Sequence, residues 1–119
     1  MRFSLYALLG SAALVAAAHA HTPLAASTPA DKASVAAPVK EIALEFGDAV
    51  RLTVVALADA AGTNKAVGDI PTAVATKFTV AIRDELGPGD YVASWRAVGA
   101  DTHVISGEIH FTVTAPHSH

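Results

Sequence analysis

The chain has 119 residues, no cysteine, and 8 basic against 11 acidic side chains, which gives a formal net charge of −3. This length fits a single small domain, and the acidic balance argues against a nucleic acid as partner. The lack of cysteine excludes disulfides and thiolate metal sites. The only methionine is Met1, so the rest of the chain offers no thioether ligand for a soft metal ion.

Residues 1–20 are predicted to form a cleavable secretory signal peptide. Arg2 provides a positive start, and residues 5–18 are almost all apolar or small. A membrane span needs about 20 apolar residues, so an uncleaved N-terminal anchor is the less favoured alternative. Ala18 and Ala20 form an A-x-A cleavage site. The predicted organisation is a signal peptide at 1–20, a domain at 21–114 and a flexible histidine-containing tail at 115–119.

Cleavage after Ala20 would make His21 the first residue of the mature protein. Its α-amine and its imidazole could then chelate one metal ion together, which an internal histidine cannot do. Residues 16–18 satisfy the same cleavage rule. Cleavage there would begin the chain at His19-Ala20-His21 and would allow a different metal site, made of the amine, backbone amides and the histidine at position three. Both starting points stay open.

From residue 22 onward, apolar side chains recur with the period of two that is typical of β-strands. An edge strand is expected at 22–28, with Pro23 near its start, where a missing N–H does little harm. The clearest later strands are predicted at 41–46, 51–57, 77–82, 91–98 and 108–113. Short strands separated by turns rich in Pro, Gly and Asp predict an all-β fold, an antiparallel β-sandwich.

Two segments are expected to depart from this strand pattern. The Ala-rich residues 25–37 are predicted to be a loosely packed connection, and residues 82–86 are the only helical candidate, a single turn. Gly47 and Asp48 are interpreted as a break between two strands. Trp95 falls on the inward face of its strand, so it is expected to belong to the core rather than to a substrate-binding surface.

Asp101 and His103 lie in a short segment between two predicted strands. Residues i and i+2 of an extended loop can point the same way, although a solvated loop pair is the commoner interpretation of Asp-x-His alone. Loops at the end of a sandwich can meet, so His21 could come close to this pair. The three residues would then supply an amine, two imidazoles and a carboxylate. This donor set suits Cu(II), with zinc as the alternative. The sequence thus predicts one Cu(II) ion per chain at His21, Asp101 and His103.

The other histidines are weaker candidates for metal binding. His110 alternates with core residues, so it is expected to face outward beside Glu108. His117 and His119 lie in the predicted tail, where metal binding would have to order a flexible segment.

Several segments of the chain form an ordered set of motifs. They lie at 18–21, 27–31, 37–46, 86–91, 94–103 and 106–113, and the most specific is Ser94-Trp95-Arg96-Ala97-Val98-Gly99-Ala100-Asp101-Thr102-His103. This set resembles the CopC family of periplasmic copper-binding proteins. The resemblance implies an immunoglobulin-like β-sandwich or Greek-key barrel outside the cytoplasm.

The resemblance also implies a site and a partner. His21, Asp101 and His103 occupy the family's Cu(II)-ligand positions, and Asp48 stands where the family often has a glutamate near that site. A CopD-like inner-membrane copper transport protein is the implied partner. The chain departs from the family at Thr102 and Val104, which replace the usual glycine and proline, and in lacking a Met-rich loop for Cu(I).

The predicted function is a monomeric periplasmic protein that captures, buffers or delivers Cu(II) in copper resistance or homeostasis, and that is not an enzyme. The alternative is a copper mono-oxygenase acting on polysaccharides, in which an N-terminal histidine supplies both amine and imidazole. A third interpretation is a plain sandwich module for protein contacts with incidental histidines. The direction of copper traffic, the affinity and the actual partner stay open.

Overall fold

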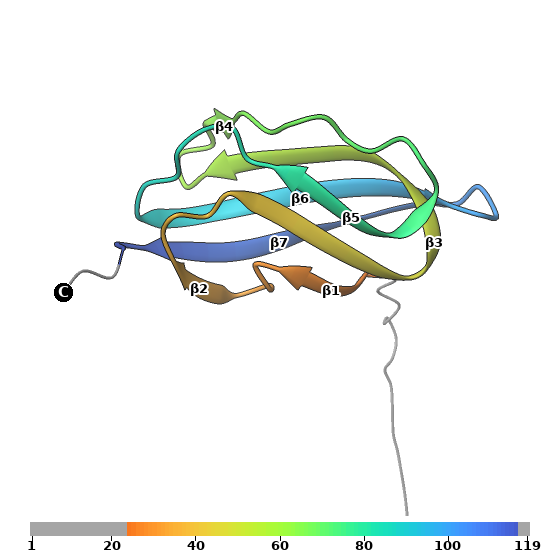
Figure 1. Cartoon of the computed structure of the whole chain (residues 1–119), viewed down its shortest axis with the longest axis horizontal. Helices are drawn as coiled ribbons and strands as arrows, with labels where there is room; N and C mark the ends of the chain where they lie inside the picture. Colours follow the sequence, from red (N-terminus) through yellow and green to blue (C-terminus); the bar gives the residue numbers. More distant parts are fainter. Residues whose placement is uncertain (1–23, 117–119) are drawn as a thin grey trace, which may run out of the picture.

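A computed structural model of the chain describes residues 24–116, and all regular secondary structure in that range is β (Figure 1). This confirms the predicted all-β fold class. No helix among these residues is long and apolar enough to cross a membrane. The strands are β1 (Leu24–Thr28), β2 (Ala33–Ala36), β3 (Glu41–Asp59), β4 (Asn64–Lys65), β5 (Ala75–Ala81), β6 (Gly89–Gly99) and β7 (Val104–Thr114).

The long strand β3 connects the two layers of the sandwich. Its first part, residues 41–46, pairs with β1 and β5, and its second part, residues 50–59, pairs antiparallel with β6. The hydrogen-bonded order is β1-β3-β6-β7-β2, with β4 and β5 attached to β3. The predicted break at Gly47 and Asp48 is therefore wrong: the chain bends there but stays a strand, because it changes partners without leaving the sheet.

The predicted loose connection at 25–37 is also wrong, since it contains most of β1 and all of β2. Ala33 to Ala36 pair in parallel with Phe111 to Thr114 of β7. The backbone N–H of Ala37 continues this pairing by donating to the carbonyl of Thr114 at 3.0 Å. Four small residues are too few to show a period in the sequence, and their place is set by hydrogen bonds to a distant strand.

Residues 82–86 form no helical turn. Ile82 makes an isolated bridge with Val67 and is buried, and the N–H of Arg83 donates to the carbonyl of Ala66 at 2.8 Å. The N–H of Arg83 is therefore used in a bond to the neighbouring segment and does not form the hydrogen bond of a helical turn. Pro88 follows closely, and the residue before a proline disfavours the helical conformation.

Alternate residues of the strands form one apolar core. Phe46 packs edge-on against Trp95 and Phe78, with ring centroids 5.2 and 5.9 Å apart, and Tyr91 stacks on Phe111 at 5.7 Å. Among the described residues, no polar or charged residue is buried. Trp95 is only 4% exposed, which confirms its predicted place in the core.

Candidate metal centre

The candidate ligands Asp101 and His103 lie on the turn that joins β6 to β7. The N–H of Gly99 donates to the carbonyl of His103, and the N–H of Thr102 donates to the carbonyl of Gly99, both at 2.9 Å. Thr102 adopts a left-handed conformation with φ 66°. A type I turn followed by one left-handed residue is a common three-residue hairpin loop, but a β-branched residue is unusual at that place.

The side chains of Asp101 and His103 contact each other. The spacing predicted that they point the same way in an extended loop, whereas Thr102 between them is left-handed. One carboxylate oxygen, Oδ1, accepts the backbone N–H of His103 at 3.1 Å, and Oδ2 lies 2.6 Å from Nδ1 of its ring. The side chains of His103 and Asp101 are 81% and 67% exposed. The pair thus stands on the surface at the tip of a hairpin, where an ion can reach it from solvent.

Each partner shifts the pKa of the other. The hydrogen bond from the His103 side chain, followed by that from its backbone, lowers the pKa of Asp101, and the Asp101 carboxylate raises the pKa of His103. One ion can bind both side chains only by replacing the hydrogen between Nδ1 and Oδ2, because Nε2 lies on the far side of the ring from the carboxylate. Metal ions and protons then compete for His103.

The described residues hold only part of a metal site. Within residues 24–116, no group of three or more His, Cys, Asp or Glu side chains is placed to hold a metal ion. His21, like His117 and His119, lies outside the described residues. Asp48 is exposed in the bend of β3, close in sequence to Val50, which is paired with Gly99 at the base of the hairpin.

His110 faces outward, as predicted, and takes no part in this pair. It lies further along β7, and its Nε2 is 3.2 Å from Oε1 of Glu108. Its backbone N–H donates to Oδ1 of Asp31 at 2.8 Å. These contacts account for His110 as a surface residue that helps to fix the connection between β1 and β2.

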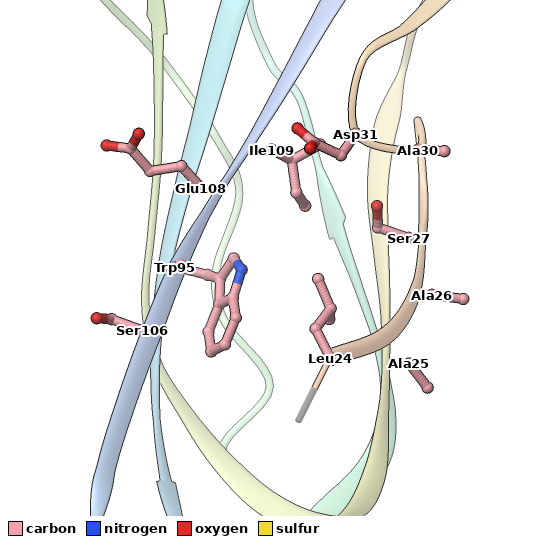
Figure 2. A pocket seen from close by; sticks show the side chains of 11 residues that line it. Leu24, Ala25, Ala26, Ser27, Ala30, Asp31, Trp95, Ser106, Glu108 and Ile109 are labelled. Atoms are coloured by element: carbon pink, nitrogen blue, oxygen red, sulfur yellow. The ribbon is translucent and has the colours of Figure 1, made fainter. Parts of the chain in front are cut away.

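A groove between β1 and β7 leads toward the hairpin. It has a volume of about 480 Å³, and its lining residues include Leu24, Ser27, Asp31, Trp95, Gly107 and Ile109. Figure 2 shows Leu24 at the level of Ser106, and Asp31 near Ile109 at the other end. The two strands therefore run in the same direction along the groove, both starting at the hairpin end. Sequence reasoning missed this β1–β7 groove. The one hint is Gly107, which is paired with Trp95 and has no side chain to fill the space beside its ring.

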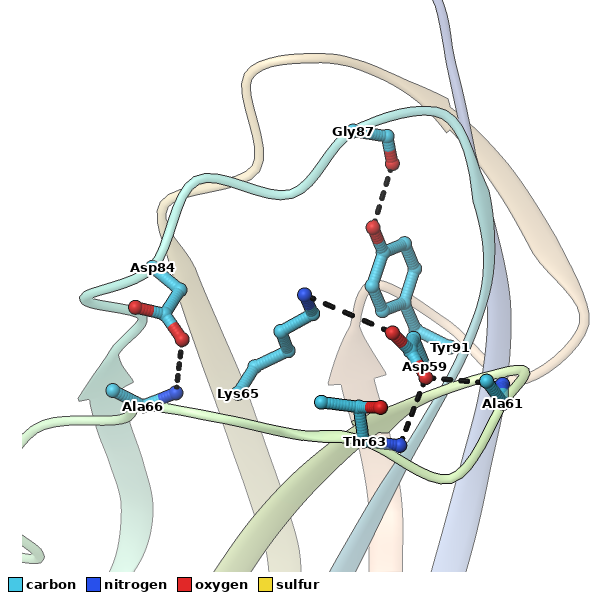
Figure 3. A network of polar contacts seen from close by, with 8 residues as sticks. All are labelled: Asp59, Ala61, Thr63, Lys65, Ala66, Asp84, Gly87 and Tyr91. Carbon is cyan, nitrogen blue, oxygen red and sulfur yellow. Dashed lines mark hydrogen bonds and ion pairs between the residues drawn. The ribbon is translucent and has the colours of Figure 1, made fainter.

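A second polar cluster lies at the opposite end of the sandwich, where β3 turns into β4 (Figure 3). Asp59 Oδ1 accepts the N–H groups of Ala61 and Thr63 at 3.0 and 2.9 Å, and Oδ2 lies 3.7 Å from Nζ of Lys65. The hydrogen bond from Thr63 is the largest cause of the lowered pKa of Asp59. This carboxylate fastens a turn, and no histidine accompanies it in the cluster.

The arrangement defines a class first: a small immunoglobulin-like β-sandwich with an exposed Asp–His pair at one end. More specifically, the chain belongs to the CopC family, because residues 24–114 match the family model described as the CopC domain. This confirms the resemblance drawn from the sequence motifs.

Known relatives agree with this assignment. The chain is 35% identical over 127 residues to copper resistance protein C of Pseudomonas syringae pv. tomato, covering 94% of this chain and 96% of that protein. CopC from Methylosinus trichosporium OB3b has a similar structure, with a TM-score of 0.70, 26% identity, and coverage of 83% and 99% of the two chains. PcoC, a methionine-rich copper resistance protein from Escherichia coli, gives a TM-score of 0.65 with 32% identity and 80% and 100% coverage.

Proposed function

We propose that this chain is an exported Cu(II)-binding protein that captures, buffers or delivers copper in copper resistance or homeostasis. Support comes from its membership of the CopC family and from relatives that are named as copper resistance proteins. Residues 1–20 act as the signal peptide in this proposal, and the periplasm is its destination. The ion is cargo, bound one per chain by a monomer.

The ligands we propose are His21, Asp101 and His103, and the course of β1 and β7 carries this proposal. Leu24 and Ser106 lie at the same level of the β1–β7 groove on strands that run in the same direction. His21 precedes Leu24 by three residues, and His103 precedes Ser106 by three residues, in both cases on the hairpin side. Three extended residues span about 10 Å, so the N-terminal histidine has the reach to meet the Asp101–His103 pair.

The donor chemistry fits Cu(II). The set comprises the α-amine and imidazole of His21, the imidazole of His103 and the carboxylate of Asp101, with Asp48 as an outer carboxylate. Nitrogen and oxygen donors favour Cu(II), whereas Cu(I) prefers sulfur. The sequence has no cysteine and no methionine beyond Met1, so we expect no tight Cu(I) site, in contrast to a methionine-rich relative.

We also propose that the protein carries copper and is not a copper mono-oxygenase. Catalysis would need a surface that holds the substrate at reacting distance and orientation. The aromatic residues that the structure describes are all buried: Phe46, Phe78, Tyr91, Trp95 and Phe111. They are therefore occupied in the core and do not form a platform for a sugar chain. A CopD-like membrane protein is the partner we propose for copper exchange.

N-terminal sequencing and copper titration test this proposal together. Sequencing of the exported protein should start at His21, and Cu(II) should quench the emission of Trp95, the single tryptophan, until one equivalent is bound. The matched control carries one extra glycine before His21, which keeps the imidazole but separates it from the α-amine. We expect the control to bind Cu(II) far more weakly. Equal binding, or a chain that starts at His19, would contradict the proposed ligands.

The mono-oxygenase alternative has its own test. The copper-loaded protein is supplied with a reductant, peroxide and candidate polysaccharides, and soluble oxidised products are measured. We expect none beyond the amount that free copper forms. Sustained turnover that disappears in His21→Ala would replace the carrier proposal with the enzyme.

A further inference from the structure

β7 has a free edge over the first half of its length. β6 pairs with residues 104–113 of β7 on one side, and β2 pairs with residues 111–114 on the other. Within the part of the chain that the structure describes, no strand pairs with the outer edge of residues 104–109. The free edge of a strand presents unpaired N–H and C=O groups, which can pair with another chain.

The outward-facing backbone groups in this stretch belong to alternate residues. His110 donates its N–H to Asp31 and accepts the N–H of Lys32, so its backbone faces away from β6. Because backbone direction alternates along a strand, Ser106 and Glu108 face the same way. Both residues line the β1–β7 groove, while their side chains point away from it in Figure 2. Their main chain therefore forms one wall of the groove.

The groove also contains a buried donor. Trp95 is 4% exposed, and its Nε1 has no hydrogen-bond partner among residues 24–116. The ring lies against Gly107, where an added Cβ would come within 3.0 Å of Nε1. Figure 2 shows this nitrogen directed toward the space between Trp95 and the side chains of Leu24 and Ile109. A buried N–H without an acceptor is unfavourable. Because Nε1 is shielded from solvent, a carbonyl in the groove would reach it once the ring shifts slightly outward.

We propose that the β1–β7 groove binds an extended segment of another protein, which adds as a strand to the free edge of β7. The segment would exchange main-chain hydrogen bonds with Ser106 and Glu108, and one of its carbonyls would accept the N–H of Trp95. The lining includes the carboxylate of Asp31 and no Lys or Arg. The segment therefore carries a basic side chain at the Asp31 end and small or apolar side chains along the rest.

The opposite end of the free edge begins at Val104, the residue after His103. A segment bound there lies beside the proposed copper ligands, which suits a protein that gives or takes copper. Only this consequence rests on the proposed function. Strand addition itself is tested with metal-free protein, so its failure is distinguishable from a failure of the copper assignment.

The first test uses a capped hexapeptide of alternating valine and threonine with one terminal lysine. It is added to ¹⁵N-labelled, metal-free protein, and amide exchange and chemical shifts are followed by NMR. We expect exchange of the Ser106 and Glu108 amides to slow at least tenfold, and the indole N–H signal of Trp95 to shift. A peptide N-methylated at alternate residues should have no effect, because it lacks the pairing donors. Changes confined to other residues, or an equal effect of the methylated peptide, would overturn the proposal.

Variants sharpen the test. Ser106→Pro removes an outward N–H without breaking a bond to β6, and Ser106→Ala is its matched control. Binding should be lost in the first and kept in the second, and Trp95→Phe should weaken it about tenfold. Equal binding by the two Ser106 variants would overturn the proposal. Slow exchange of both amides without peptide would also overturn it, since another part of the chain or a second copy would then cover the edge; concentration dependence separates these two cases.

Discussion

The turns at the two ends of the sandwich share a backbone design. In the β3–β4 turn the N–H of Gly62 donates to the carbonyl of Asp59, and in the β6–β7 turn the N–H of Thr102 donates to that of Gly99, both at 2.9 Å. The residue that completes each turn is left-handed, with φ 85° at Gly62 and φ 66° at Thr102. One turn has the residue that this conformation favours, and the other does not.

The two turns differ in the partners of their aspartate side chains. The Asp59 carboxylate is 28% exposed and is taken by two backbone N–H groups and the fixed positive charge of Lys65. The Asp101 carboxylate is 67% exposed and faces His103, whose ring can lose its proton and bind a metal ion. The same hairpin loop thus serves stability at one end and, in our proposal, copper at the other.

Removing the histidine should produce the largest difference between the turns. His103→Ala is expected to lower the affinity for Cu(II) more than about 100-fold, because loss of an outer partner of a ligand already costs 10–100-fold. Its melting temperature should fall only slightly, and only where the Asp101–His103 pair is charged, since exposed ion pairs contribute little to stability. Competition titration measures the affinity. Lys65→Ala at the other turn and His110→Ala on β7 are the controls, and a comparable loss in either would break the assignment.

The charge of Asp101 gives the next largest expected effect. Asp101→Asn should lower the pKa of His103 toward its usual value near 6.5, because the carboxylate is what raises it. If Asp101 also binds the metal, Cu(II) affinity at neutral pH should fall about 10–100-fold. NMR titration of metal-free protein gives the pKa. Asp59→Asn should leave His103 unchanged, and an unchanged pKa in Asp101→Asn itself would contradict the pairing.

The Asp101–His103 ion pair stabilises the fold only within a limited range of pH. A raised His103 pKa contributes stability that is present at low pH and lost as pH rises through the folded-state value. A lowered Asp101 pKa contributes stability that is present above its unfolded value and lost as pH falls through the folded-state value. The contribution is therefore greatest between about pH 4 and pH 6.5, the usual values of the two groups, and Asp101→Asn should remove the window. A stability profile identical to that of the natural chain would exclude the pair as its source.

Much of the fold could be predicted from local sequence. The alternation through 41–46, 91–98 and 108–113 predicted strands and placed Trp95 inside, because a buried face imposes a period of two. The bend at Gly47 and the short β2 could not be predicted in this way. Both depend on which distant strand supplies the hydrogen bonds, and a bend and a turn have similar composition.

The candidate site was predictable only in part. The spacing of Asp101 and His103 predicted that their side chains point the same way. It did not predict that the carboxylate also accepts the backbone N–H of His103, which depends on the left-handed Thr102. The β1–β7 groove and the unpartnered N–H of Trp95 depend on strands far apart in the sequence. The role of His21 depends on a cleavage event, so it stays a prediction.

Gly62 allows the free-energy cost of a left-handed backbone conformation to be measured, because a new side chain there would contact no other residue. Gly62→Thr should destabilise the protein by about 1–2 kcal/mol, the cost of that conformation for an ordinary residue, because a Cβ there meets nothing within 4 Å. Thermal unfolding should register about 4–8 °C for each kcal/mol in a domain of this size. Gly87→Ala, also in open space but without a positive φ, should be nearly neutral. Equal effects of the two variants would mean that φ is not the cause.

The reverse change at the copper end should give the smallest effect, with the opposite sign. Thr102→Gly removes the left-handed strain but adds freedom to the unfolded chain, so a net gain of about 0.5–1 kcal/mol is expected. Thr102→Val keeps the β-branch and should give no gain, which separates backbone strain from loss of the hydroxyl. Copper titration of the same variants then shows what the strain does. If affinity holds while stability rises, Thr102 is only a costly substitute for glycine. If affinity falls, the strained turn itself holds Asp101 and His103 in the geometry that binds copper.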